Sequence, residues 1–182
     1  MKKIAFILLT VMFFASLSAQ TTVKEPEFAG EIVLLNSDST TTLLEKSTVQ
    51  IKINSAAIQL TGFGSAKEKL TIAGCCASVR THSGRIQLIV RAVDNISDPM
   101  SIIQIIKFDV SKKARKTELA SVSAFGASSN NMQLLPFTGK KYGTASYLLI
   151  TANAEKGEYG VIVRNPNSRD EKTTVVSTFA ID

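Results

Sequence analysis

Hydrophobic and polar residues alternate along several short segments of this chain, as they do in half-buried β-strands. Segments 49–54, 86–92, 158–164 and 174–182 place most of their apolar side chains on one face and polar side chains on the other. Successive side chains of a strand point to opposite faces of a sheet, so a period of two indicates a strand with one face in a core. We therefore predict a strand in each of these four segments.

Two further segments are apolar on both faces. Segment 102–106 reads Ile-Ile-Gln-Ile-Ile, and segment 147–150 reads Tyr-Leu-Leu-Ile. Strands covered on both sides carry such runs, so we predict that both are central strands. β-Branched residues dominate the chain, and only segment 112–119 favours a helical turn. Short strands separated by Gly, Pro, Asn and Asp predict an all-β fold, an antiparallel β-sandwich.

We place the β-sandwich domain at residues 28–182. Its first part, 28–82, either extends the same sandwich or forms a small lobe before a unit at 84–182. Residues 154–161, Ala-Glu-Lys-Gly-Glu-Tyr-Gly-Val, resemble the tyrosine corner of immunoglobulin-like sandwiches, where a Tyr hydroxyl bonds back to nearby backbone. The resemblance implies an Ig-like architecture for the C-terminal part, with Tyr159 in that role.

The first 19 residues have the layout of a cleaved signal peptide. Two lysines precede an apolar run at 4–14, and small residues follow before Gln20. The run is about 11 residues long, whereas a membrane-spanning helix needs roughly 20. We therefore predict a secreted protein, periplasmic or extracellular, with no transmembrane segment in the mature chain. Residues 20–27 form a polar leader that we expect to be mobile.

Several short segments support the same location. The end of the signal, together with segments 31–35, 91–95, 98–101 and 157–160, is similar to uncharacterised secreted β-sandwich proteins of Bacteroidota. The resemblance implies a place in the bacterial envelope or exterior, and it carries no activity with it.

Charge suggests how the protein binds. The chain has 21 basic and 15 acidic residues, a net charge of +6, which is too mild to indicate nucleic-acid binding. Few aromatic residues lie among the basic ones, so base stacking is also not expected. We predict that two basic groups and a neighbouring tyrosine contact an envelope protein or an anionic surface glycan: Lys112, Lys113, Arg115 and Lys116, then Lys140, Lys141 and Tyr142.

The two cysteines, Cys75 and Cys76, are adjacent. Neighbours in a strand point to opposite faces, which favours two free thiols, one buried and one exposed. The alternative is a vicinal disulfide in a turn at Gly74. Two adjacent thiols and the single histidine, His82, do not complete a tetrahedral metal site, so we predict neither a metal nor another cofactor.

Catalytic chemistry finds little support. His82 lies in a predicted exposed turn, which disfavours a Ser-His-Asp triad. We predict a noncatalytic binding module. A structural subunit of a surface assembly is the first alternative. A less favoured one is a small secreted hydrolase that uses Asp94, Asp98 or Asp109 as paired carboxylates.

Overall fold

The computed structural model describes residues 23–82, 84–151, 154–164 and 173–182. The predicted signal peptide, 1–19, lies outside the described residues. Within them, no helix is long and apolar enough to cross a membrane. In chain order the elements are β1 (Ile32–Leu35), β2 (Thr41–Leu43), β3 (Glu45–Asn54), α1 (Ala56–Thr61), β4 (Ser65–Ala73), β5 (Arg80–Thr81), β6 (Gln87–Arg91), α2 (Pro99–Ile102), β7 (Ile103–Ser111), β8 (Ala114–Ser123), β9 (Ser128–Asn130), β10 (Phe137–Tyr142), β11 (Ser146–Thr151), β12 (Gly157–Val163) and β13 (Thr173–Ile181).

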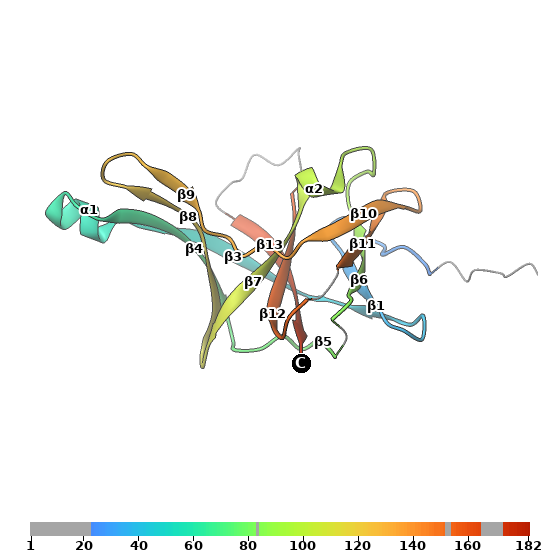
Figure 1. Ribbon diagram of the computed structural model, residues 1–182. Helices are drawn as coiled ribbons and strands as arrows, with labels where there is room; N and C mark the ends of the chain where they lie inside the picture. Colours follow the sequence, from blue (N-terminus) through green and yellow to red (C-terminus); the bar gives the residue numbers. More distant parts are fainter. Residues whose placement is uncertain (1–22, 83, 152–153, 165–172) are drawn as a thin grey trace, which may run out of the picture.

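The strands form two sheets (Figure 1). The five-stranded sheet has the order β10-β11-β6-β1-β2, and the eight-stranded sheet has the order β12-β7-β8-β4-β3-β13-β5, with β9 beside β8. Because β12 also pairs with β13, six strands of the larger sheet close into a ring, which the sequence did not predict. The pairs are antiparallel except for β5 and β13, which are parallel. The predicted all-β, antiparallel class is confirmed.

The two halves of the chain interleave in both sheets. From the first half, β1 pairs with β6 in one sheet and β4 pairs with β8 in the other. The strands of residues 28–82 therefore pair both with one another and with strands of residues 84–182, and they do not form a separate sheet.

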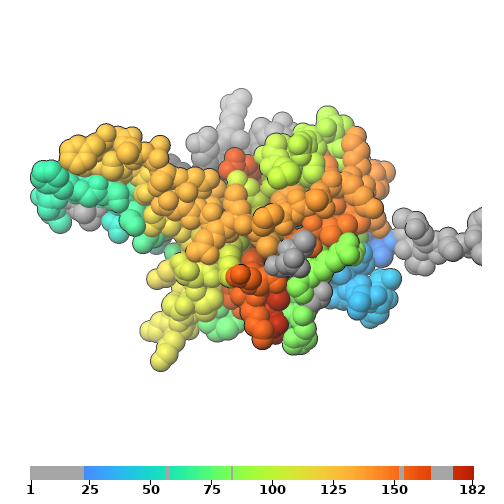
Figure 2. Space-filling view, in the orientation of Figure 1, coloured from blue at the N-terminus to red at the C-terminus, as the bar shows by residue number. Residues whose placement is uncertain are grey.

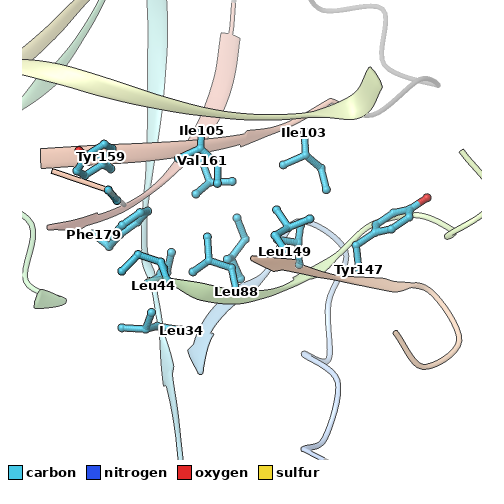
Figure 3. Close-up of a cluster of buried hydrophobic side chains, with 14 of the residues drawn as sticks. Leu34, Leu44, Leu88, Ile103, Ile105, Tyr147, Leu149, Tyr159, Val161 and Phe179 are labelled. Atoms are coloured by element: carbon cyan, nitrogen blue, oxygen red, sulfur yellow. The ribbon is translucent and has the colours of Figure 1, made fainter. Parts of the chain in front are cut away.

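The main hydrophobic cluster lies between the two sheets (Figure 3). Leu34, Leu88 and Leu149 come from the five-stranded sheet, and Tyr159 and Phe179 come from the other. The rings of Tyr159 and Phe179 stack with their centroids 5.4 Å apart. The Tyr159 hydroxyl donates a hydrogen bond to the Glu155 carbonyl, at 2.7 Å, so the predicted bond back to nearby backbone is confirmed.

A second cluster is formed by strands of the closed ring, and β7 contributes to both clusters. Ile103 and Ile105 pack in the main cluster, whereas Ile106 and Phe108 pack in the second. This shared position explains why segment 102–106 is apolar on both faces, and it confirms the prediction of a central strand. The other members of the second cluster are Val49, Leu70, Ile72, Ile162 and Val176.

The N-terminal segment, residues 23–27, covers the outer face of the five-stranded sheet. Val23 packs on a small cluster that includes Leu148 of β11. The Glu25 carboxylate accepts hydrogen bonds from the Ser146 hydroxyl, at 2.6 Å, and from the Thr144 amide, at 2.7 Å, and it pairs with Arg91 at 2.9 Å. Residues 23–27, part of the predicted leader, therefore have partners on the sheet through both a carboxylate and an apolar side chain.

The cysteines correct one prediction. Cys75 and Cys76 form a vicinal disulfide in the loop between β4 and β5. Free thiols were predicted on the geometry of a strand, but β4 ends at Ala73, and Gly74 adopts a left-handed φ of 87°. Gly74 also donates its amide to the carbonyl of Lys113, at 2.9 Å, which fixes the start of the loop.

The helical turn expected at 112–119 is also wrong. Lys112 and Lys113 form the turn between β7 and β8, and β8 begins at Ala114. Pairing of β8 with β4 along most of its length overrides the local helix preference. The helices lie at 56–61 and at 99–102, where Asp98 caps α2 by accepting a hydrogen bond from the Met100 amide, at 2.9 Å.

Candidate functional site

The first predicted basic group lies at the turn between β7 and β8. Lys112, Lys113 and Lys116 are exposed there. A hydrogen bond from the Gly74 amide to the Lys113 carbonyl joins this turn to the disulfide loop, so the lysines lie beside that loop. This arrangement presents three cationic side chains to solvent on a fixed backbone.

Arg115 does not belong to that surface. Its side chain points inward and is only 3% exposed. Its guanidinium lies 3.4 Å from the Glu45 carboxylate and 3.8 Å from that of Glu158. The prediction of Arg115 as a contact residue for a partner is therefore wrong. Side chains of β8 alternate between its two faces, and Arg115 shares its face with Thr117, which is also buried.

The carboxylates around Arg115 form a connected network. Glu45 accepts hydrogen bonds from the Thr178 hydroxyl, at 2.6 Å, and from the Ser78 hydroxyl, at 2.7 Å. Burial tends to raise the pKa of Glu45, but these hydrogen bonds and the Arg115 charge outweigh it and lower that pKa. Glu158 accepts from the Ala77 amide, at 2.7 Å.

Arg80 extends the network to the end of β13. Its guanidinium donates to Glu158, at 2.9 Å, and to Asp182. Hydrogen bonds to Asp182 and then to Glu158 raise the pKa of Arg80. Because the network joins residues 77–80, which end the disulfide loop and begin β5, to strands of the ring, its role is structural: it holds the disulfide loop in place.

The second predicted basic group lies elsewhere. Lys140 and Lys141 are exposed on β10, at the edge of the five-stranded sheet. In Figure 1, β10 is at the upper right and the β7–β8 turn at the lower left, so the structure does not bring the two groups together. Tyr142 is half-buried, and its hydroxyl donates to the Val23 carbonyl, which gives it a role in holding the N-terminal segment.

The acidic candidates make local contacts typical of turns. Asp94 accepts from the Ile96 amide, at 3.1 Å, and Asp98 caps α2. Asp109 lies opposite Lys116 in the ladder of β7 and β8, and His82 is exposed, as predicted. Nowhere in the described part of the chain do three or more His, Cys, Asp or Glu side chains gather as a metal site would require.

A feature that the sequence analysis missed is a projecting arm, residues 52–69 and 118–130. It consists of the outer parts of β3, β4 and β8 together with α1 and β9, and it extends away from the rest of the molecule at the left of Figures 1 and 2. The strand ladders continue along it, from Ile53 opposite Glu68 to Ser65 opposite Ser123. The arm is therefore an ordered ribbon.

The end of the arm is apolar and exposed. Leu60 is 84% exposed and Phe125 is 85% exposed, and Phe63 and Ile53 are also exposed. The rings of Phe63 and Phe125 lie 6.3 Å apart, so they form one patch contributed by two loops. None of these four residues belongs to a hydrophobic cluster of the interior.

Lysines border this end of the arm. Lys52 lies opposite Lys69 in the ladder of β3 and β4, and Lys67 lies opposite Asn54, so the three lysines share one face. All three are exposed, and Lys67 pairs with Glu118 at 3.1 Å. The sequence itself indicates this arrangement. Segments 53–66 and 119–139 contain no charged residue, and Lys52 and Lys67 directly flank segment 53–66.

Comparisons of this chain with protein-family models, with curated proteins and with solved structures give no match.

Proposed function

We propose that this protein is a secreted, noncatalytic binding module of the bacterial envelope or exterior, and that the projecting arm makes its main contact. The observation that carries the proposal is the patch formed by Phe63 and Phe125, together with the exposed Leu60 of the same arm; none of the three belongs to a core. Burying a leucine or phenylalanine side chain contributes about 1.5–3 kcal/mol. A group of such side chains left exposed therefore marks an interaction surface.

The chemistry of the arm indicates the chemistry of its partner. The patch requires an apolar counterpart, and the lysines beside it, Lys52, Lys67 and Lys69, require anionic groups at its border. A glycan alone offers few apolar groups, so this surface favours a partner that is apolar and bordered by negative charge.

The exposed lysines of the β7–β8 turn, Lys112, Lys113 and Lys116, support a second, electrostatic contact with an anionic partner. Lys140 and Lys141 would make a separate contact, since they lie on the other sheet. Neither group includes Arg115, which is buried.

The proposal also retains the predicted relationship of the C-terminal part to Ig-like sandwiches. We propose that residues 84–182 are related to Ig-like sandwiches, and the support is the hydrogen bond from Tyr159 to the Glu155 carbonyl, the interaction that defines a tyrosine corner. Packing of the five-stranded sheet on the ring through one shared core supports a sandwich-like arrangement.

The test measures retention of the purified mature protein by envelope membranes, which contain both proteins and lipids. The double variant Phe63→Ser/Phe125→Ser should reduce retention at least tenfold, because it removes the apolar patch and leaves the cores untouched. The matched control is Phe28→Ser, which changes an exposed phenylalanine outside the arm. Retention of the double variant at the wild-type level would contradict the proposal.

Charge reversal tests the second contact. Lys112→Glu/Lys113→Glu should weaken retention at low salt and have little effect at high salt, because exposed charges are screened. Equal retention of this variant and the wild type at low salt would remove the turn from the binding surface.

A further inference from the structure

We propose that the end of the arm inserts into the interfacial region of a lipid bilayer that carries anionic headgroups. This inference rests on the proposed function and names the partner of the arm. Three features of the arm support it: its lack of charge at the end, the position of its lysines, and its convex shape.

The end of the arm has the composition expected for contact with lipid. Segment 53–66 supplies Ile53, Leu60 and Phe63, and segment 119–139 supplies Phe125, with no charged residue in either. The remaining side chains of the tip are small or uncharged, and a charged side chain there would be costly to bring into an apolar medium. Aromatic residues favour the boundary between water and hydrocarbon, which is where the two phenylalanines would lie.

The lysines lie directly behind this uncharged end. Lys52, Lys67 and Lys69 share one face of the ribbon, and Glu118 is the acidic residue beside them on that face. Glu68 lies on the opposite face, next to Ile53. Three lysines against one carboxylate leave a positive face at the level where lipid phosphates would stand. Lysine side chains can extend their amino groups to headgroups while their stems lie along apolar groups.

Like charges also lie directly opposite each other in the ladder, at Lys52 and Lys69. Such pairs destabilise a sheet in water. An anionic headgroup between the two amino groups would relieve this repulsion, so binding would stabilise the arm.

The shape of the arm favours a membrane over a protein pocket or a second copy. The arm projects from the rest of the molecule, as Figure 2 shows, and the patch belongs to this arm. A projection can enter a lipid surface without a preformed cavity. A second copy would bring another set of lysines to the same contact, where like charges repel. Insertion would be shallow, because β9 is an edge strand whose outer backbone groups need water or headgroups as partners.

The absence of tryptophan from the chain permits a specific test. In Phe125→Trp, indole emission reports on the end of the arm alone. We expect a blue shift with vesicles of phosphatidylcholine and phosphatidylglycerol, quenching by brominated acyl chains in them, and weak binding to phosphatidylcholine alone. Phe28→Trp, the matched control, should show neither shift nor quenching.

The lysines are tested in the same assay. Lys52→Gln/Lys69→Gln on the Phe125→Trp background should weaken binding to the anionic vesicles about 30-fold, which corresponds to about 1 kcal/mol for each lysine. Neither residue lies in a core, and the double variant removes a repulsive pair, so the fold should be retained and circular dichroism checks it.

The outcomes separate this inference from the proposed function. The lipid proposal is overturned if the emission of Phe125→Trp is unchanged with all vesicles, whether or not the protein binds them. It is also overturned if the emission shifts to the blue without vesicles as the protein concentration rises. If Phe63→Ser/Phe125→Ser still loses retention by envelope membranes, the arm remains the contact surface and its partner is a protein. If that retention is also unchanged, both proposals fail.

Discussion

At the scale of single residues, Gly160 shows how tightly the second core is built. It lies between Tyr159 and Val161, which face the main cluster, while its own position faces the second one. A Cβ atom there would lie 2.6 Å from side-chain atoms of Phe108 and of Val176. Glycine is required at this position because the Phe108 and Val176 side chains leave no room for a Cβ atom.

Gly160→Ala should therefore destabilise the protein by about 1–3 kcal/mol, the usual cost of overpacking a core. Urea unfolding at equilibrium measures it. The double variant Gly160→Ala/Val176→Ala should lose less than the sum of the two single variants, because the smaller residue at 176 makes room for the new methyl group. Strict additivity would show that the methyl group is accommodated in another way.

At the scale of elements, the N-terminal segment depends on one carboxylate. Glu25 accepts hydrogen bonds from Ser146, Thr144 and Ala145, and these bonds lower its pKa from 4.5 to about 2, although burial acts in the opposite direction. The neighbouring Gly143 lies so close that a Cβ atom there would overlap the Glu25 carboxylate. The turn before β11 is thus shaped around this side chain.

The lowered pKa of Glu25 has a defined consequence for stability. A depressed pKa means that the folded state favours the ionised carboxylate. The contribution of this carboxylate to the free energy of unfolding is therefore fully present above pH 4.5 and is lost as the pH falls toward about 2. Glu25→Gln should be less stable than the wild type at neutral pH, and the difference should shrink through that range.

Urea unfolding of both proteins over this pH range measures the difference. Glu27→Gln, an exposed position on the same segment, is the control and should show no comparable dependence. A difference between Glu25→Gln and the wild type that stays constant with pH would contradict the assignment.

The projecting arm is a second group of elements that extends beyond the hydrophobic cores. Its inner end joins the second core at Leu70 and Val49, and its outer end contributes to no cluster. Its strands are held by their ladders with each other, so its apolar end is available for contact without loss of the fold.

At the scale of the whole molecule, two apolar cores and an ionic network hold the chain together. The network around Arg115 joins β3, β8, β12 and the loop at 77–80. The disulfide between Cys75 and Cys76 links neighbours in sequence, and it ties no two distant elements together. A cross-link restricts the unfolded chain more when it closes a longer loop, so this one contributes little to global stability.

Reduction of the disulfide should therefore leave the thermal midpoint nearly unchanged. The loop keeps its contacts on both sides of the cysteines, through Gly74 to Lys113 and through Ala77 to Glu158. Thermal unfolding with and without a reducing agent measures the effect, with Cys75→Ser/Cys76→Ser as the matched control and mass spectrometry to verify the disulfide. A large drop in the midpoint would show that the bond supports the fold.

Local patterns in the sequence predicted the class of fold and the positions of six of the thirteen strands in the described residues. Alternation of apolar and polar residues is a local property, so it located strands such as β3 and β6. The apolar run at 102–106 also indicated burial on both faces, and Tyr159 was recognised from its neighbours alone. For the candidate site, the sequence identified the exposed lysines at 112, 113 and 116.

Strand pairing depends on the folded chain as a whole, because alternation within one strand does not specify its partners. Closure of the ring buried Arg115 between Glu45 and Glu158, which are distant in sequence. The same topology carried β3 beyond the core, so Ile53 is exposed although it has the same pattern as the buried Val49. A two-residue period in the sequence indicates which side chains share a face, whereas the packing of other elements decides whether that face is covered.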